Sequence, residues 1–158
     1  MKIIRIFVAS SAELKLERME LVDLMQDLNE VYEEKNIKLK PVLWEYMDSS
    51  MRAERKEDEY LVELCKCEIC IVMFWQTIGE YTVEELDVAV KEMRAGKNPK
   101  QVYLLFKENN DNISEELKLF KSSFYNENKQ IPSYVFGNST ELRNIVAKIL
   151  NPQNILML

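Results

Sequence analysis

The chain has 158 residues, 47% hydrophobic and 30% charged, a balance typical of one folded globular domain. Its formal net charge of −6 argues against a general binder of nucleic acid or of anionic membranes, since both partners need a basic surface. It contains no histidine, which excludes every Ser-His, Cys-His and His-metal mechanism within the chain, so carboxylates would carry any proton transfer.

The first predicted element is a strand from Ile3 to Ala9, a nearly continuous run of β-branched and aromatic residues. Arg5 interrupts the run, and no cleavage pattern follows it, so the segment differs from a signal peptide. No stretch approaches the roughly 18 apolar residues of a membrane span. We therefore expect a cytoplasmic protein with no membrane partner and no nucleic-acid partner.

A long helix is predicted next, roughly from Ala12 to Lys35. Its apolar stripe has the three-and-four spacing of a helix and consists of Leu14, Leu21, Met25, Leu28 and Tyr32. Arg18 falls on the same stripe, where an unpaired charge would be costly. We expect Arg18 to pair with a carboxylate at the site or to touch a substrate phosphate. The alternative is that its stem carries the charge back to solvent.

A second strand is predicted from Ile37 to Glu45, and Pro41 places it at a sheet edge because proline cannot donate to a ladder. A helix from Arg52 to Cys65 should follow. It begins with a run of charged residues that we interpret as a solvated surface, with an intersubunit contact as the alternative.

Three cysteines, Cys65, Cys67 and Cys70, lead into the third predicted strand, from Glu68 to Trp75. Their spacing includes one C-x-x-C, but a zinc site needs a fourth ligand. Because free cysteine is often buried, we interpret them as ordinary core or strand-edge residues and expect no metal site.

The remaining elements alternate in the same way. We predict a helix from Thr82 to Ala95 that Gly96 ends, a strand from Gln101 to Phe106, a helix capped by Ser114, a strand from Ser133 to Phe136, and a last helix capped by Ser139 or Thr140. Residues 1–150 then form one domain, and residues 151–158 form a tail or the start of a linker.

This alternation predicts an α/β fold: a five-stranded parallel flavodoxin-like sheet in the order 2-1-3-4-5, with helices on both faces. Strands one and three are then neighbours at the point where the strand order reverses. Ligands bind there, outside the carboxyl ends of the strands. The residues that leave these two ends are Ser10-Ser11 and the turn from Trp75 to Glu85.

Two carboxylates lie near the start of the third predicted helix, from Thr82 to Ala95. At about 100° per residue, Val83, Leu86 and Ala89 share one side of the helix, Glu84 projects away from it, and Glu85 lies on its flank. Glu85 would then look across the strand ends as a catalytic carboxylate. The alternative is a capping box, because Thr82-Val83-Glu84-Glu85 matches S/T-x-x-E, in which Glu85 would only bond the Thr82 amide.

Two segments resemble bacterial TIR-like (Toll/interleukin-1-receptor-like) domains. The segment from Phe7 to Arg18 is similar to the group beginning F-I-S-S-T-x-x-D-L-x-x-E-R, from which Ala12 and Glu13 depart. The segment from Gly79 to Ala89 is similar to the G-x-x-Y-T-x-x-E-x-x-x-A of the same group. Its T-x-x-E-x-x-x-A part is also similar to nucleoside 2-deoxyribosyltransferases.

In both families the glutamate at the position of Glu85 breaks an N-glycosidic bond, so the resemblance implies an NAD glycohydrolase with NAD as substrate and no cofactor. The transition state would resemble an oxocarbenium ion, which a carboxylate can stabilise. Substrate contacts are expected from Gly79, Tyr81 and Thr82 of the shared motif. Trp75, Tyr81 and Trp44 would stack on a base, and Ser10 and Ser11 would hold phosphate. The alternatives are rim or core packing for the tryptophans and simple helix capping for the serines.

Three functions are therefore open. The first is an NAD glycohydrolase that acts as a signalling or defence effector, assembles as a homo-oligomer, and works with a fused or partner sensor domain. The second is a nucleoside 2-deoxyribosyltransferase or nucleotide N-glycosidase on the same fold. The third is a non-catalytic TIR-like interaction module.

Overall fold

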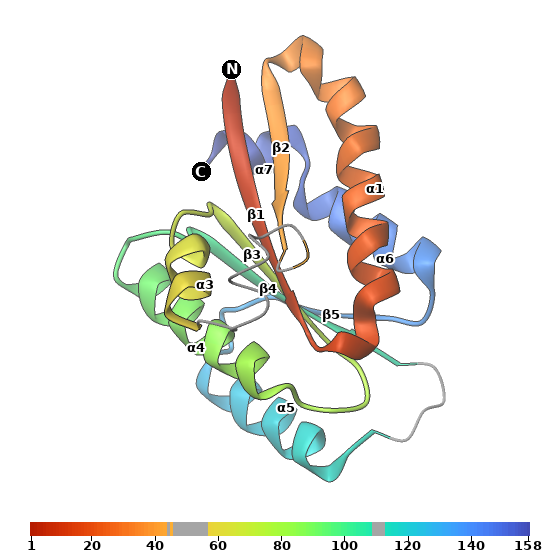
Figure 1. Cartoon of the computed structure of the whole chain (residues 1–158), viewed down its shortest axis with the longest axis vertical. Helices are drawn as coiled ribbons and strands as arrows, with labels where there is room; N and C mark the ends of the chain where they lie inside the picture. Colours follow the sequence, from red (N-terminus) through yellow and green to blue (C-terminus); the bar gives the residue numbers. More distant parts are fainter. Residues whose placement is uncertain (44, 46–56, 109–112) are drawn as a thin grey trace.

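Five parallel strands form one sheet in the order β2-β1-β3-β4-β5, which confirms the predicted fold (Figure 1). The structure is a computed structural model, and it describes residues 1–43, 45, 57–108 and 113–158. The strands are β1 (Lys2–Ser10), β2 (Ile37–Val42), β3 (Ile69–Phe74), β4 (Gln101–Lys107) and β5 (Ser133–Phe136). β2 is an edge strand, as Pro41 predicts.

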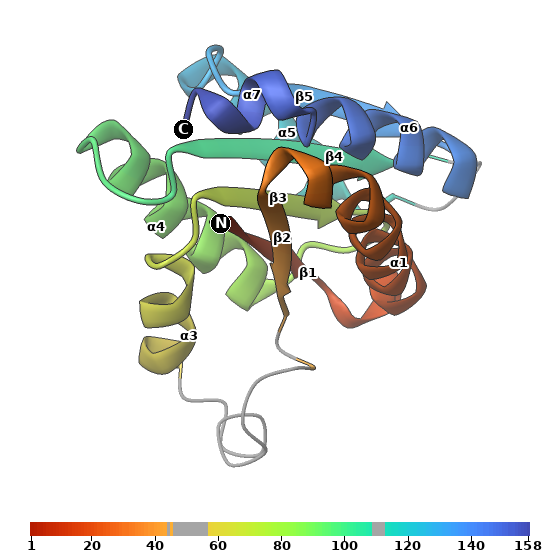
Figure 2. The ribbon, with the colours of Figure 1, turned by 90° about the horizontal axis from the view of Figure 1, so that it is seen from above.

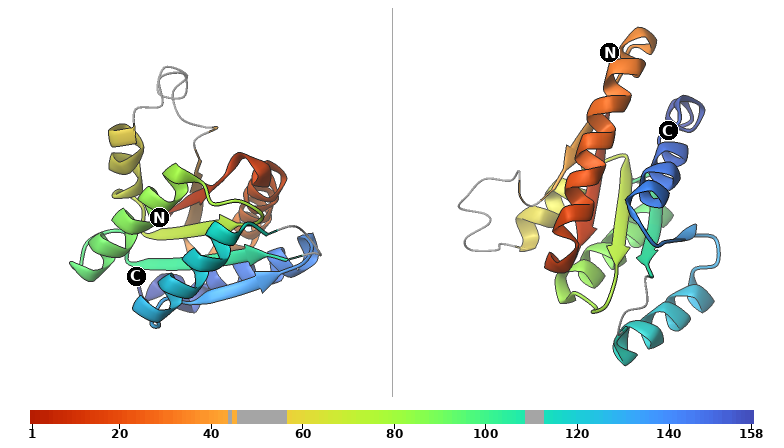
Figure 3. Two further views of the ribbon diagram at one scale, coloured as in Figure 1. Left: turned by 90° about the horizontal axis from the view of Figure 1, so that it is seen from below. Right: turned by 90° about the vertical axis from the view of Figure 1, so that its right-hand side faces the viewer.

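Helices connect these strands in alternation. They are α1 (Lys15–Tyr32), α3 (Glu57–Leu64), α4 (Glu80–Arg94), α5 (Glu115–Glu127), α6 (Ser139–Ile149) and α7 (Pro152–Leu156). Two short 3-10 helices, η1 (Ala12–Leu14) and η2 (Glu33–Lys35), flank α1 and complete the long helical segment predicted there. Figures 2 and 3 show the helices arranged around the twisted sheet.

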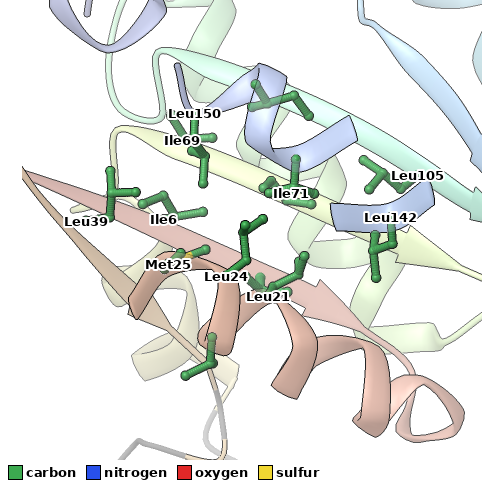
Figure 4. Close-up of a cluster of buried hydrophobic side chains, with 14 of the residues drawn as sticks. Ile6, Leu21, Leu24, Met25, Leu39, Ile69, Ile71, Leu105, Leu142 and Leu150 are labelled. Atoms are coloured by element: carbon green, nitrogen blue, oxygen red, sulfur yellow. The ribbon is translucent and has the colours of Figure 1, made fainter. Parts of the chain in front are cut away.

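The sheet separates two buried apolar clusters, as parallel strands covered on both faces require. One cluster joins α1 and α6 to one face, and Figure 4 shows Leu21, Met25 and Leu142 directed at strand residues there. The other cluster joins α3, α4 and α5 to the opposite face through Leu64, Leu86 and Phe124, among others. The central strand β3 is therefore buried on both sides along its whole length.

Several predicted boundaries shift in the structure. The last long helix begins at Ser139, and Asn138 caps it by accepting a hydrogen bond from the Glu141 N–H at 2.9 Å, so capping by Ser139 or Thr140 was wrong. The segment expected as a tail contains α7, and its Ile155 is fully buried. Of the helix predicted from Arg52, residues 52–56 lie outside the described part of the chain.

The cysteines behave as core residues. Cys67 and Cys70 are buried, and all three cysteines are free. Within residues 1–43, 45, 57–108 and 113–158, no group of three or more metal-binding side chains is found, and no helix is long and apolar enough to cross a membrane.

Candidate functional site

The candidate site lies at the carboxyl ends of β1 and β3. These strands pair in parallel, with Ser10 opposite Met73, so the loops that follow them leave the sheet side by side. The first loop carries Ser11 and η1, and the second carries Trp75 to Gly79 before α4 begins. The switch point predicted from the sequence is therefore present, and it brings the two segments of the TIR-like resemblance together.

The start of α4 tests the capping role that was the alternative for Glu85. The helix begins at Glu80 with Gly79 as its N-cap, and the Val83 N–H donates to the Gly79 carbonyl at 3.1 Å. Thr82 is therefore the third residue of the helix, and Glu85 lies in its second turn. A capping box needs Thr82 at the N-cap and Glu85 in the first turn. The capping alternative, and the predicted helix start at Thr82, were wrong.

Glu85 is directed into the fold. Glu85 is 7% exposed, whereas the neighbouring Glu84 is exposed to solvent. This confirms the prediction from helix periodicity that Glu84 projects away from the apolar side of the helix. Leu86 and Ala89 on the same helix are fully buried. Burial, and after it the charge of Glu85, raises the pKa of the Cys70 thiol on β3 well above its usual value. The Glu85 carboxylate therefore lies beside the sheet, close enough to Cys70 for its charge to affect that thiol.

Three small residues meet where the two loops approach each other. A Cβ added to Gly79 would lie 2.8 Å from the Thr82 Oγ1 and 3.5 Å from the Ser11 Cβ. Thr82 is only 4% exposed, and it precedes Glu85 by three residues on the same side of α4. The helix face that carries Thr82 and Glu85 therefore faces the end of β1, and glycine allows the close approach.

Ser11 has an unusual environment at this point. Its Oγ is buried and has no hydrogen-bond partner within the described part of the chain. It occupies the N-cap position of η1 without making a side-chain cap, so simple capping does not explain it. The N-cap of α4, Gly79, has no side chain to cap that helix either. An unsatisfied hydroxyl thus lies beside a helix N-terminus, and such a terminus attracts anions.

Arg18 lies behind this region rather than at the surface. It is 1% exposed, and its Nε donates to both Glu45 carboxylate oxygens at 2.8 and 3.1 Å. Its Nη1 donates to the Ser10 Oγ at 2.5 Å and to the Ser11 carbonyl at 2.8 Å. The carboxylate partner predicted for Arg18 is confirmed, and the solvent alternative was wrong. Arg18 therefore joins both serines to Glu45, which follows β2. The role predicted for Ser10 as a phosphate ligand stays a prediction.

The aromatic residues predicted to stack on a base differ in their surroundings. Trp75 is partly buried, and the Lys107 Nζ lies 3.9 Å from the centre of its ring. Lys107 also pairs with Glu17 at 2.7 Å, so a cation already covers one face of Trp75. Tyr81 is 39% exposed in the first turn of α4. Trp44 lies outside the described residues. Stacking by these three residues stays a prediction.

Two carboxylates of this region were missed as site residues. Glu45 lies three residues after the end of β2, and its role as the Arg18 partner could have been found, because strands one and two are neighbours in the predicted order. Glu13 accepts hydrogen bonds from the Gln76 N–H at 2.6 Å and the Thr77 Oγ1 at 2.5 Å. No sequence pattern indicates this contact, because it joins loops 63 residues apart.

A groove of about 450 Å³ lies near this edge of the sheet, between α1 and α6. Phe136 and Leu142 form its apolar floor, while Glu17, Glu20 and Asp23 lie on its rim together with Lys107. Glu85 does not line this groove, because α4 covers the opposite face of the sheet from α1 and α6. We therefore place the candidate site by its chemical groups rather than by this groove.

Comparisons with known proteins give matches in structure. No protein-family model matches the chain, and a search of curated proteins finds no significant match. The chain is similar to the CMP N-glycosidase BcmB of Clostridium botulinum, with 17% identity and a TM-score of 0.52 over 92% of this chain and 99% of that one. It is also similar to the SEFIR domain of IL-17 receptor B, with 10% identity and a TM-score of 0.55 over 91% of this chain and 97% of that one. At these identities the likeness shows the fold.

Proposed function

We propose that this chain hydrolyses the N-glycosidic bond of a nucleotide, with Glu85 as the catalytic carboxylate and NAD as the substrate. One observation carries the proposal. Within the described part of the chain, Glu85 is the one carboxylate that is buried, and it lies on the face of α4 that meets the end of β1. A buried carboxylate on the helix that follows the switch point of an α/β sheet is a candidate for catalysis.

The chemistry suits a chain without histidine. When the bond between nicotinamide and ribose breaks, the leaving group departs from a cationic pyridinium as a neutral base, so it needs no strong general acid. Positive charge develops on the ribose, as in glycoside hydrolysis, and a carboxylate stabilises it or attacks the anomeric carbon. Water then completes the hydrolysis. Cytosine, the base of CMP, needs a proton to leave as a neutral molecule, so cleavage of CMP would need a general acid as well, whereas cleavage of NAD needs only the one carboxylate.

A phosphate group on the substrate explains the surroundings of Ser11. Its unsatisfied hydroxyl can donate to a phosphate oxygen, and the N-terminus of α4, which has no side-chain cap, supplies a positive partial charge beside it. Gly79 keeps this approach open, since a Cβ there would lie within 3.5 Å of Ser11. These groups favour a nucleotide, which carries phosphate, over a nucleoside as the substrate.

The test compares substrates and two adjacent carboxylates. Concentrated protein is incubated with NAD, with CMP, and with deoxynucleosides plus free bases, and the release or exchange of base is followed. Glu85→Gln should lower turnover about 100-fold or more, as expected for a group that acts in the transition state. Glu84→Gln is the matched control, because Glu84 is the exposed neighbour on the same helix. Both variants should keep the wild-type melting temperature.

Each outcome distinguishes the functions. Release of nicotinamide that depends on Glu85 supports the NAD glycohydrolase, and self-association that raises this release supports the effector role. Cleavage of CMP alone favours the nucleotide N-glycosidase, for which the similarity to BcmB is the specific observation. Base exchange favours the deoxyribosyltransferase. If no substrate reacts, even after forced oligomerisation, both enzyme proposals fail and the interaction module stands.

A further inference from the structure

Glu13 joins the two loops that form the candidate site. Its Oε1 accepts a hydrogen bond from the Gln76 N–H at 2.6 Å, and its Oε2 accepts one from the Thr77 Oγ1 at 2.5 Å. The Thr77 N–H lies 3.4 Å from the same Oε1. One carboxylate on the β1 side therefore binds both residues that follow Trp75 on the β3 side. Hydrogen bonds to an ionised acceptor are shorter and stronger than neutral ones.

Glu13 is itself held in place. It lies in the middle of η1, and the next residue, Leu14, is fully buried in the core under α1. The Leu14 N–H donates to the Ser11 carbonyl at 3.1 Å, and that carbonyl also accepts from Arg18. The carboxylate thus extends from a short helix that is packed and hydrogen-bonded on the β1 side, and it can fix a partner loop.

The loop between β3 and α4 is also held from its other side. The Gln76 carbonyl accepts a hydrogen bond from the Ser114 N–H at 2.8 Å, at the start of α5. The Ser114 Oγ caps that helix by accepting from the Leu117 N–H at 3.1 Å. Both backbone groups of Gln76 are therefore bonded, the N–H to Glu13 and the carbonyl to α5. The loop between β3 and α4 has its start fixed by these two contacts.

The fixed loop leads directly to the groups proposed to bind phosphate. Gly79 follows Gln76 by three residues and contacts Ser11 and Thr82 closely enough that a Cβ would not fit beside the Thr82 Oγ1. A shift of the loop by 1 Å would change the approach of the α4 N-terminus to Ser11. Site groups need to stay within about 0.5 Å of their productive positions, so a contact that fixes this loop has a functional consequence.

We infer that Glu13 is a positioning residue of the nucleotide site. It holds the start of α4 against Ser11 and does not touch the substrate. The inference rests on the function proposed above, and it adds a residue whose loss should weaken nucleotide binding more than it slows the chemical step. Glu85 lies in the second turn of α4, where the buried Leu86 and Ala89 hold the helix against the sheet independently of Glu13.

Two measurements that do not depend on turnover can test the contact between Glu13 and the loop. In Glu13→Ala, hydrogen exchange of the Gln76 and Thr77 amides should rise roughly tenfold or more, while the amides of β3 stay protected. In a Glu85→Gln background, whose turnover should be lower by about 100-fold or more, addition of Glu13→Ala should raise the Kd of NAD, or of CMP, about tenfold by titration calorimetry. In the single variant, KM should rise about tenfold and kcat should change less than about threefold.

Four further variants sharpen the test. Glu34→Ala is the matched control, because Glu34 is an exposed carboxylate in the other 3-10 helix, η2, and it should leave exchange, Kd and KM unchanged. Glu13→Gln keeps the size of the side chain and replaces one acceptor with a donor, so it should show the same direction of change if Glu13→Ala does not fold. Thr77→Val should raise KM, and Thr77→Ser, which keeps the hydroxyl, should restore it.

The outcomes separate this inference from the proposed function. Faster exchange together with weaker nucleotide binding supports the positioning role. Unchanged exchange, or faster exchange with unchanged Kd and KM, overturns it while a wild-type enzyme that cleaves nucleotide stays active. A kcat that falls as far as KM rises also overturns it, since Glu13 would then act on the chemical step. A wild-type protein that neither binds nor cleaves NAD or CMP overturns the proposed function and this inference together.

Discussion

The Arg18 guanidinium and the Glu45 carboxylate form an ion pair inside the fold, with the Nε 2.8 Å from Oε1 and 3.1 Å from Oε2. Arg18 is 1% exposed and Glu45 is 14% exposed, so water screens the pair little. The same guanidinium bonds Ser10 and the Ser11 carbonyl. One side chain of α1 therefore joins the end of β1 to the segment that follows β2.

Removal of Arg18 should destabilise the fold. Arg18→Met deletes the charge that compensates Glu45 and the donors that satisfy Ser10, and breaking such a pair costs about 3 kcal/mol in the free energy of unfolding. Urea denaturation followed by circular dichroism measures it. Arg143→Met is the control, because Arg143 also bonds two carboxylates, Glu20 and Asp27, but on a more exposed surface. It should cost less than about 1 kcal/mol. Equal losses for the two variants would contradict the buried role of Arg18.

Ser11→Ala should separate stability from function. The Ser11 Oγ is buried without a hydrogen-bond partner in the described structure, so its deletion removes an unsatisfied group and should leave the melting temperature unchanged or slightly higher. A substrate phosphate that uses this hydroxyl would lose one bond, so KM for the nucleotide should rise roughly tenfold. Differential scanning fluorimetry and steady-state kinetics give the two numbers. A clear loss of stability would show that Ser11 is structural.

Gly79 and Gly96 should respond to alanine for different reasons. At Gly79, φ is −84°, which alanine adopts freely, but the new Cβ would lie 2.8 Å from the Thr82 Oγ1. We expect a loss of about 1–2 kcal/mol from this overpacking, and Thr82→Ala in the same chain should recover much of it. At Gly96, φ is +75° and no atom lies within 4 Å, so only backbone strain of about 1 kcal/mol is expected, with no rescue by Thr82→Ala. Denaturant unfolding of the single and double variants tests both.

The buried thiols should make stability depend on alkaline pH. Burial first, and then the nearby Glu68 and Glu63 charges, raises the pKa of Cys67 from 9.0 to about 12. The unfolded chain therefore releases this proton at lower pH than the folded chain. Stability from the protonated thiol is present below about pH 9 and is lost between pH 9 and about 12. The free energy of unfolding should fall over this range, and Cys67→Ser should make it fall less steeply. No change in slope would contradict the burial of the thiol.

Much of the fold follows from local pattern. Buried parallel strands are continuous apolar runs, and helices that cover them carry one apolar stripe, so the order of elements and the sheet could be predicted from the sequence. The same periodicity placed Glu84 outside and Glu85 inside. It also required a partner for Arg18, because a charge on a core-facing stripe is costly. These properties depend on neighbours within a few residues.

The site itself depends on contacts between loops. The sequence indicated that Arg18, on a core-facing stripe, would have a carboxylate or a substrate phosphate as its partner unless it reached solvent, and only the tertiary structure showed that Glu45 supplies the carboxylate. The start of α4 followed the capping pattern in the prediction, but in the structure the loop before it is held by Glu13 and Ser114, and the helix begins at Glu80. Helix periodicity is local, so the sequence specifies it. Which polar groups meet at the strand ends is decided by strand order and loop path, because these bring together residues that are far apart in the chain.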